Sequence, residues 1–422
     1  MKKKYLICGI IVILLLVGGC FIVFNKNESK NNNIMDDDYE KEDNFSINLI
    51  KEINKQREEN YLISPYSIEI ALNMLRDGAR GNTKDEIDSV IYNRKINSII
   101  VKNRIGVANA AFIRNKYKNY VEKDYYDTLK NSYNAEILYD EFNTPEVINN
   151  WVNDKTSGMI KKVVDEIDDD FVLGLANALA IDVEWENQFE CNNTNSEKFT
   201  KSDGTGINVE MMHSDYKTSD YKYIELANAK GIIIPYRRYD SETGEENYTG
   251  DSRLEFIGLL PNDNINSFIN SLTIDTLDNL DSNSREASSD LTIRLSLPRF
   301  NYEYDLKDFS SILYNMGIRD AFDPVNADFT GIIERNNEVD NLYVGVAVHK
   351  TYIDLNEKGT KAAAVTYFGM KDSASMADKS EIIDISFNKP FVYMIRDVET
   401  KEILFFGTVY EPNLWEGTTC SN

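Results

Sequence analysis

The stretch "LTIRLSLPRFNYEYDLKDFSSILYNMGIRDAFDPVNADFTGI", Leu291–Ile332, opens with the clearest strand pattern in this 422-residue chain. Every second residue at its start is leucine or isoleucine, which gives a strand one apolar face. These residues are Leu291, Ile293, Leu295 and Leu297. Further on, "PFVYMIRDVET" and "KEILFFGTVYEP" predict a hairpin that turns at "DVETKE".

Helical patterns dominate the earlier half of the chain. "NFSINLIKEINKQ" and "PYSIEIALNMLRDGARG" carry apolar residues at helical spacing, and Gly78 and Gly81 are expected to end the second helix. "TPEVINNWVNDKTSGMIKKVV" has the same spacing, with Pro145 near its start. Helices first and strands later predict an α+β domain.

Composition narrows the classes of function. The formal net charge of -24 argues against a nucleic-acid partner, because phosphate contacts need clustered Lys and Arg. The four cysteines, Cys8, Cys20, Cys191 and Cys420, show no metal-ligand spacing, so neither a metal nor a cofactor is expected. A pairing of Cys191 with Cys420 stays open. The only two histidines, His213 and His349, lie in no catalytic motif, and His213 is interpreted as a structural or surface residue.

The N-terminus predicts a membrane attachment. "YLICGIIVILLLVGGCFIVF", Tyr5–Phe24, has no charge, is long enough to cross a bilayer and follows the basic "MKKK". Residues 1–24 are therefore either an uncleaved signal anchor or a lipoprotein signal with Cys20 as the lipidated residue. Both alternatives place the rest of the chain outside the cytoplasm. Residues 25–43 are polar and predict a flexible stalk, and 413–422 predict a short tail.

Several segments, taken in order, resemble the serpin family of protease inhibitors. They are "LISPYSIEIALNMLRDGARGNTKDEI", "VANAAFI", "INNWVNDKTSGMIKKVV", "LANALAIDVEWENQFE", "LSLPRFNYEYDLKDFSSILYNMGIRDAFDPVNADFTGI", "VHKTYIDLNEKGTKAAA" and "FNKPFVYMIRD" with "ILFFGTV". The resemblance covers residues 44–412. It implies one monomeric α+β domain, with a helical N-terminal part packed on large, mainly antiparallel sheets and an exposed reactive-centre loop.

The resemblance gives a role to "EKGTKAAAVTYFGM", Glu357–Met370, as the hinge and first half of that loop. In serpins a target protease attacks the loop and forms an acyl-enzyme. The cut loop then inserts into the main sheet as a new strand and distorts the attached protease. The hinge residues implied here are Glu357, Gly359, Thr360, Ala362, Ala363 and Ala364.

The residues themselves suit insertion. No proline occurs between Glu357 and Glu381, so every backbone donor that a central strand needs is present. Alternate positions that would enter the core carry no charge, and Gly359 suits a pivot. These alternate positions are Thr360, Ala362, Ala364, Thr366 and Phe368.

The resemblance implies two further sites. A polar cluster beneath the central strands, at which the sheet opens, corresponds to Ser64, Ser67, Asn177 and His349. The two serines also suit a helix cap, which is compatible with that role. Trp185 corresponds to the aromatic residue where insertion begins, and core packing is the alternative for it.

The reactive bond stays open at this stage. Counting fourteen residues from Gly359, the usual family spacing, gives Ser373–Ala374, whereas counting back from "FNKPF" points to Lys379. Met370, Lys371 and Met376 are further alternatives.

The leading interpretation is an extracytoplasmic inhibitor of serine or cysteine endopeptidases, whose partner is a target protease held as a covalent acyl-enzyme. One rival is a non-inhibitory serpin-like binding or carrier protein, and the uncharged hinge disfavours it. A hydrolase is a second rival. It is disfavoured because the chain contains neither a G-x-S-x-G nor an H-E-x-x-H motif, so the protein is not expected to be an enzyme.

Overall fold

The computed structural model describes residues 8–13, 44–55, 57–92, 100–101, 104–250, 254–307, 309–335, 341–360 and 381–412. The predicted stalk, the predicted tail and Cys20 lie outside these ranges. Within them, no helix is both long enough and apolar enough to cross a membrane.

The described ranges contain eight α-helices, five of them before residue 156. They are α1 (Phe45–Asn54), α2 (Pro65–Gly78), α3 (Gly81–Ile91), α4 (Lys123–Tyr133), α5 (Glu146–Lys155), α6 (Ile265–Ser271), α7 (Ile274–Asp278) and α8 (Phe309–Met316). Three short 3-10 helices are η1 (Asn115–Tyr117), η2 (Cys191–Asn193) and η3 (Asp320–Phe322). Polar caps explain the starts of the first two helices, since Asn44 and Ser64 each accept a backbone N–H of the first turn.

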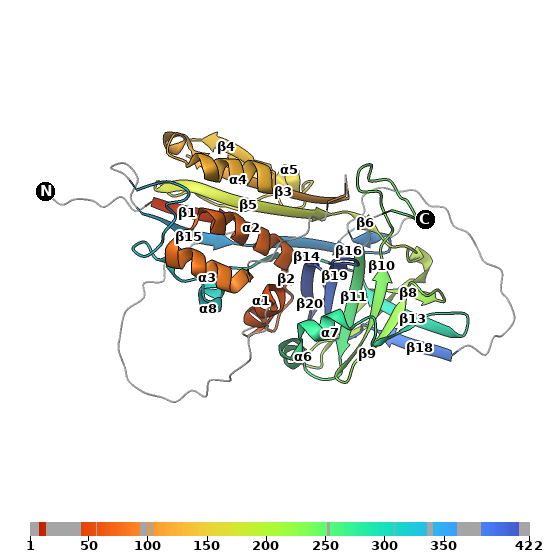
Figure 1. The fold of residues 1–422 in the computed structure, drawn as a ribbon. Helices are drawn as coiled ribbons and strands as arrows, with labels where there is room; N and C mark the ends of the chain where they lie inside the picture. The colour runs from red at the N-terminus through yellow and green to blue at the C-terminus, as the bar shows by residue number, and fades with distance from the viewer. Residues whose placement is uncertain are drawn as a thin grey trace, which may run out of the picture.

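Two of the sheets follow one another along the same chain segments. The first has the order β15 (Leu342–Val348), β1 (Cys8–Ile13), β5 (Phe171–Ile181), β3 (Ile105–Arg114) and β4 (Glu136–Asp140). The second has the order β14 (Phe300–Asp305), β16 (Lys350–Leu355), β17 (Gly359–Thr360) and β6 (Val183–Glu184). Because β5 leads into β6 and β15 into β16, we treat these two sheets as one and call it the large sheet (Figure 1).

Two further sheets complete the fold. The first has the order β12 (Ser284–Glu286), β9 (Lys222–Glu225), β10 (Ala229–Pro235), β11 (Leu254–Pro261), β19 (Phe391–Asp397), β20 (Ile403–Val409) and β2 (Leu62–Ile63). The second has the order β18 (Glu381–Ser386), β13 (Leu291–Pro298), β8 (Gly206–Tyr216) and β7 (Thr194–Thr200). The predicted hairpin is the antiparallel pair β19–β20.

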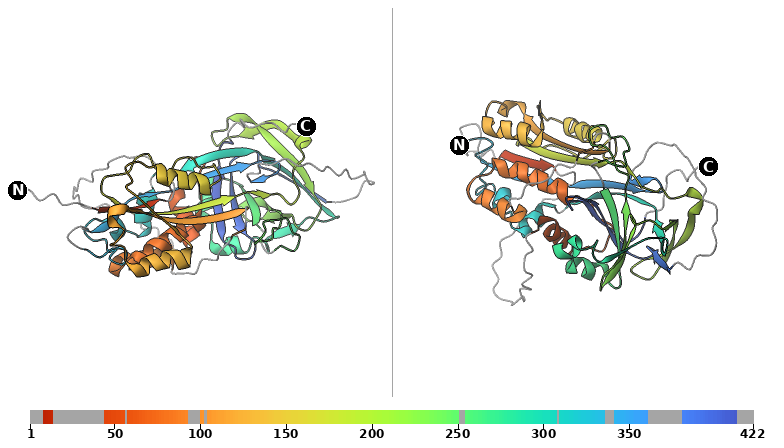
Figure 2. Two further views of the ribbon diagram at one scale, coloured as in Figure 1. Left: turned by 90° about the horizontal axis from the view of Figure 1, so that it is seen from above. Right: turned by 45° about the vertical axis from the view of Figure 1, so that its right-hand side comes forward.

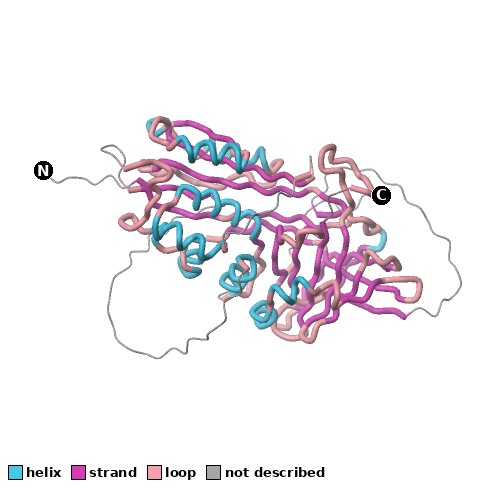
Figure 3. Tube along the Cα trace, viewed as in Figure 1, coloured by secondary structure: helices cyan, strands magenta, loops and turns pink. Residues whose placement is uncertain are grey.

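The large sheet is covered on both faces. On β3, Ala111 and Ile113 join the main core with α1 and α2, whereas Ala110 and Phe112 join a second core under α5. The strands of the large sheet run along the molecule, and β10, β11 and β19 cross them at one end (Figures 1 and 3). Most helices lie towards the other end (Figure 2). The predicted α+β architecture with mainly antiparallel sheets is confirmed.

Candidate functional site

The candidate site is the line along which the large sheet can take up another strand. We call the interval between the β5–β6 segment and the β15–β16 segment the central seam. Among the described residues no ladder joins these segments directly. β17 pairs antiparallel with β16 and β6 at one end of the seam, which we call the upper end, and β1 pairs parallel with β5 and β15 at the other, the lower end. In Figure 1 the seam runs across the picture, with the lower end on the left and the upper end on the right.

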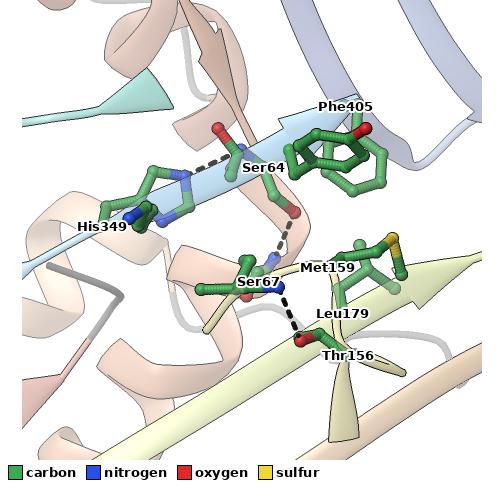
Figure 4. A pocket seen from close by; sticks show the side chains of 11 residues that line it. Ser64, Ser67, Thr156, Met159, Leu179, His349 and Phe405 are labelled. Atoms are coloured by element: carbon green, nitrogen blue, oxygen red, sulfur yellow. Dashed lines mark hydrogen bonds between the residues drawn. The ribbon is translucent and has the colours of Figure 1, made fainter. Parts of the chain in front are cut away.

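The middle of the seam is narrow. Two cavities of about 20 Å³ and about 10 Å³ lie there, and Met159, Leu179, Tyr352 and Phe405 line both of them. Figure 4 shows three of these four side chains, Met159, Leu179 and Phe405, beside the polar residues Ser64, Ser67 and His349. A strand that enters the middle of the seam must therefore move these side chains apart.

Gly359 stands where the hinge meets the sheet. Its partner in the ladder is Glu184, and a Cβ atom built on Gly359 would lie 2.1 Å from the Val183 carbonyl oxygen. Any side chain at this position would push the hinge away from β6. The sequence predicts a pivot with backbone freedom at this glycine, and the structure adds its close approach to a neighbouring strand.

Thr360 is already seated in the sheet. It pairs with Leu355 and Val183, only 2% of its surface is exposed, and its hydroxyl lies 2.6 Å from the Tyr236 hydroxyl. Tyr236 stacks on Trp185, with ring centroids 4.5 Å apart. The first inserted residue therefore rests on an aromatic pair in the core.

Trp185 holds the turn just before the hinge as well as packing in the core. Its backbone N–H donates to the Lys358 carbonyl at 2.9 Å, and its indole Nε1 donates to the Asn356 carbonyl at 2.8 Å. The side chain is fully buried. This position is compatible with both alternatives given for Trp185, and its place at the insertion point stays a prediction.

A buried ion pair fixes the start of the hinge. Glu357 Oε1 accepts from Arg299 Nε at 2.6 Å and from the Thr194 hydroxyl at 2.6 Å. The side chains of Glu357 and Arg299 are 6% and 3% exposed. The sequence predicts Glu357 as a hinge residue but gives no signal for Arg299 and Thr194, which lie 58 and 163 residues away.

The predicted polar cluster forms connected hydrogen bonds beneath the seam. The Ser67 hydroxyl donates to Asn177 Oδ1, and the Ser67 N–H donates to the Ser64 hydroxyl at 3.1 Å. The Ser64 N–H in turn donates to His349 Nε2 at 3.0 Å (Figure 4). The four residues thus link α2 to β5 on one side of the seam and to the start of β16 on the other.

Two features of this cluster were not predicted. Asn177 Nδ2 donates to Asn109 Oδ1 at 2.8 Å, and Asn109 Nδ2 donates to the Tyr133 carbonyl at 2.8 Å, which extends the chain of bonds to β3 and α4. Burial lowers the pKa of His349 to about 3, so its Nε2 is a neutral acceptor at ordinary pH. The asparagine within "VANAAFI" was the available signal for Asn109.

The remaining predicted loop residues lie outside the described ranges. They are Ala362, Ala363, Ala364, Met370, Lys371, Ser373, Ala374, Met376 and Lys379. On the far side of the loop, β18 pairs parallel with β13. Glu381, the first residue of β18, accepts two hydrogen bonds from Arg285, of 2.9 and 2.6 Å. The two ends of the loop therefore belong to different sheets.

Two other predicted residues lie away from the seam. His213 is on β8, where its Nδ1 lies 2.9 Å from the Ser296 hydroxyl and its Nε2 lies 2.9 Å from a Glu197 carboxylate oxygen. Cys191 forms a disulfide bond, and its pairing with Cys420 stays a prediction because Cys420 lies outside the described ranges.

Comparisons with known proteins agree with this geometry. The family model "Serpin (serine protease inhibitor)" matches residues 40–412. An uncharacterized serpin-like protein of Methanosarcina acetivorans is 30% identical over 87% of this chain and 85% of its own. The leukocyte elastase inhibitor of Xenopus tropicalis is 28% identical over 87% of this chain and 97% of its own.

Among solved structures, the thermophilic serpin tengpin in its native state is 30% identical, covering 92% of this chain and 97% of its own with a TM-score of 0.73. The predicted resemblance is therefore confirmed over the globular part of the chain. With the family model matching most of its length and a seam that already holds the start of the hinge, the chain belongs to the serpin family.

Proposed function

We propose that this serpin is a suicide inhibitor of serine endopeptidases that acts by insertion of its cut reactive-centre loop. The protease attacks the loop and forms an acyl-enzyme. The freed loop then inserts into the central seam as a strand and carries the protease with it. This happens before water hydrolyses the ester bond of the acyl-enzyme. The serpin itself supplies no catalytic group.

The observation that carries the proposal is the position of Gly359–Thr360. These residues already pair with strands on both sides of the seam, while the flanking strands do not pair directly with each other in the described part of the chain. Continuing β17 by further residues needs no new nucleus, because each one extends an existing antiparallel ladder. The uncharged alternate residues that follow suit burial.

The reactive bond that we propose is Ser373–Ala374. Small residues there suit elastase-like or subtilisin-like pockets, and the similarity to a leukocyte elastase inhibitor supports an elastase-like target. A cut after Lys371 or Lys379 would point instead to a trypsin-like protease.

The test is incubation with a panel of elastase-like, subtilisin-like, trypsin-like and cysteine endopeptidases. We expect at least one of these proteases to form a covalent complex that survives SDS. Mass spectrometry should then show that the released peptide begins at Ala374. Cleavage by every protease without any complex would reject inhibition and leave a non-inhibitory binding protein.

We further propose that the domain acts outside the cytoplasm. The disulfide bond of Cys191 supports this location, because such bonds persist in oxidising compartments, and the uncharged run Tyr5–Phe24 supports attachment. Protease added to intact cells should remove the domain from the surface. A lipid label lost in Cys20→Ala would favour the lipoprotein route, and intact protein in the cytosol would reject both routes.

A further inference from the structure

Strand β1 occupies the lower half of the central seam. Cys8–Ile13 pairs parallel with β5 on one side and with β15 on the other (Figure 1). At its upper end Ile13 lies opposite Ala176 and Val348. At its lower end Cys8 lies opposite Leu342. The same six residues belong to the uncharged N-terminal run.

The cut loop would need the same positions. Thr360 pairs with Leu355 and Val183, and in an antiparallel ladder each step along the loop is one step back along both partners. Counting down in this way brings Tyr367 opposite Val348 on one side and opposite Ala176 on the other. These are the partners of Ile13, and both sides of the seam give the same answer.

Only one strand fits between β5 and β15. Neighbouring strands in a sheet lie about 4.8 Å apart, so a strand that pairs with both β5 and β15 fills the interval between them. The loop can add residues 361–366 above β1. From Tyr367 to Ser373 it meets positions that β1 already holds.

We propose that β1 is a displaceable strand, and that the cut loop completes its insertion only by expelling Cys8–Ile13 from the seam. This inference rests on the proposed function, since it requires the loop to insert, and it applies to the chain in which Cys8–Ile13 is neither removed with a signal nor held in a bilayer. The direction of β1 favours the exchange, because parallel pairing is slightly weaker per residue than the antiparallel pairing that the loop makes. In the uncut molecule β1 keeps the lower seam filled.

The test is hydrogen exchange of backbone amides in the full chain, before and after the loop is cut between Met370 and Met376. Before the cut, the amides of Cys8–Ile13 should exchange at least about tenfold more slowly than in the unfolded chain. After the cut, they should lose this protection while residues 367–372 gain it.

Three other results are distinguishable. Fast exchange of Cys8–Ile13 before the cut would reject the strand in the seam and leave loop insertion standing. Slow exchange of both Cys8–Ile13 and the loop after the cut would overturn the proposal, because it would show that the two segments do not compete for the seam. A Cys8–Ile13 segment that is held in a bilayer would give this result. A loop that stays fast after the cut would reject insertion itself, and the displacement with it.

A matched pair of variants tests whether β1 limits the rate. Ile11→Pro removes a backbone donor in the middle of β1 and should speed the gain of protection in the cut loop about tenfold. Ile11→Val keeps the donor and should insert its loop at the rate of the unaltered chain. Equal rates in Ile11→Pro and Ile11→Val would overturn the proposal.

Discussion

Thr360 is the residue at which the hinge enters the core. Its side chain is almost fully buried, and its hydroxyl meets Tyr236 above the stacked ring of Trp185. A residue at this point must be small, uncharged and able to hydrogen bond. These requirements follow from the contacts of the site.

Thr360→Arg should turn the inhibitor into a substrate. Burying an unpaired charge costs several kcal/mol, so the arginine should leave the sheet in the uncut molecule and would have to be buried during insertion. This cost slows insertion, and the acyl-enzyme is then hydrolysed before the protease is trapped. We expect the yield of covalent complex to fall about tenfold or more while the loop is still cut, as gel densitometry would measure. Thr360→Ser, which keeps the hydroxyl, is the control. An unchanged yield in Thr360→Arg would exclude Thr360 from insertion.

The pair Glu357–Arg299 should contribute strongly to the stability of the uncut molecule. Removing one member takes away the opposite charge from a buried site, which costs about 3–5 kcal/mol. Urea denaturation of Glu357→Ala should show this loss. The exposed pair Lys162–Asp165 is the control, and its removal should change the free energy of unfolding by about 0.5 kcal/mol or less. Equal effects of the two changes would contradict the buried pair.

The buried His349 should make the free energy of unfolding depend on pH. Burial lowers its pKa from 6.5 to about 3, so only the unfolded chain takes up this proton between those values. Its contribution is therefore complete above about pH 6.5 and is lost as the pH falls towards about 3, by at most about 1.4 kcal/mol per pH unit. Asp305, whose pKa burial raises to about 6, has the opposite slope between 3.8 and 6.

Comparing the unaltered protein with His349→Gln isolates the effect of His349, because Asp305 is present in both proteins and contributes equally. The difference in free energy of unfolding between the two should shrink as the pH falls from 7 to 4. A constant difference would show that His349 does not stay neutral in the folded protein.

At the scale of elements, the uncut loop is restrained by its two ends. Insertion down to Ser373 would leave the eight residues Ala374–Glu381 to return to β18. Eight extended residues reach about 28 Å. The inserted strand would already span about 43 Å at 3.3 Å per residue. Full insertion of an uncut loop therefore requires β18 to leave β13.

Glu381→Lys should weaken the attachment of β18 by placing two cations together, since Glu381 now binds Arg285. Both side chains are exposed, so the pair contributes little, and warm storage should inactivate the variant only about two- to fivefold faster. Residual inhibitory activity over time measures this. Glu381→Gln should lie between Glu381→Lys and the unaltered protein, and identical rates in all three would reject the restraint.

Local patterns predict the elements well where they contain their own boundary signals. Ser64 and Pro65 mark the start of α2, and Gly78 ends it, but Gly81 begins α3 where the pattern predicted only a stop. The alternating stretch after Leu291 is two strands in different sheets, β13 and β14, separated at Arg299. Alternation reports which face is apolar but carries no information about which partner strand lies alongside.

Long-range partners of the site could not be predicted for the same reason. No local signal joins Arg299 to Glu357, or Asn109 to Asn177, because each pair meets only after distant segments pack. Strand β1 was missed because an uncharged apolar run suits a membrane segment and a buried strand equally.

At the scale of the whole molecule, inhibition by loop insertion requires the uncut fold to be metastable. Cutting the loop frees its N-terminal part from the restraint that the attachment to β18 imposes. The seam then offers backbone partners on both sides. The energy released on insertion is what moves the protease. It must appear as extra stability of the cut protein.

The most direct test is the unfolding temperature of the full chain before and after the loop is cut between Met370 and Met376. Calorimetry on the same preparation, uncut and cut, makes the comparison. If the cut loop inserts, the unfolding temperature should rise by about 10 °C or more, because an added central strand contributes several kcal/mol. Equal unfolding temperatures would contradict loop insertion.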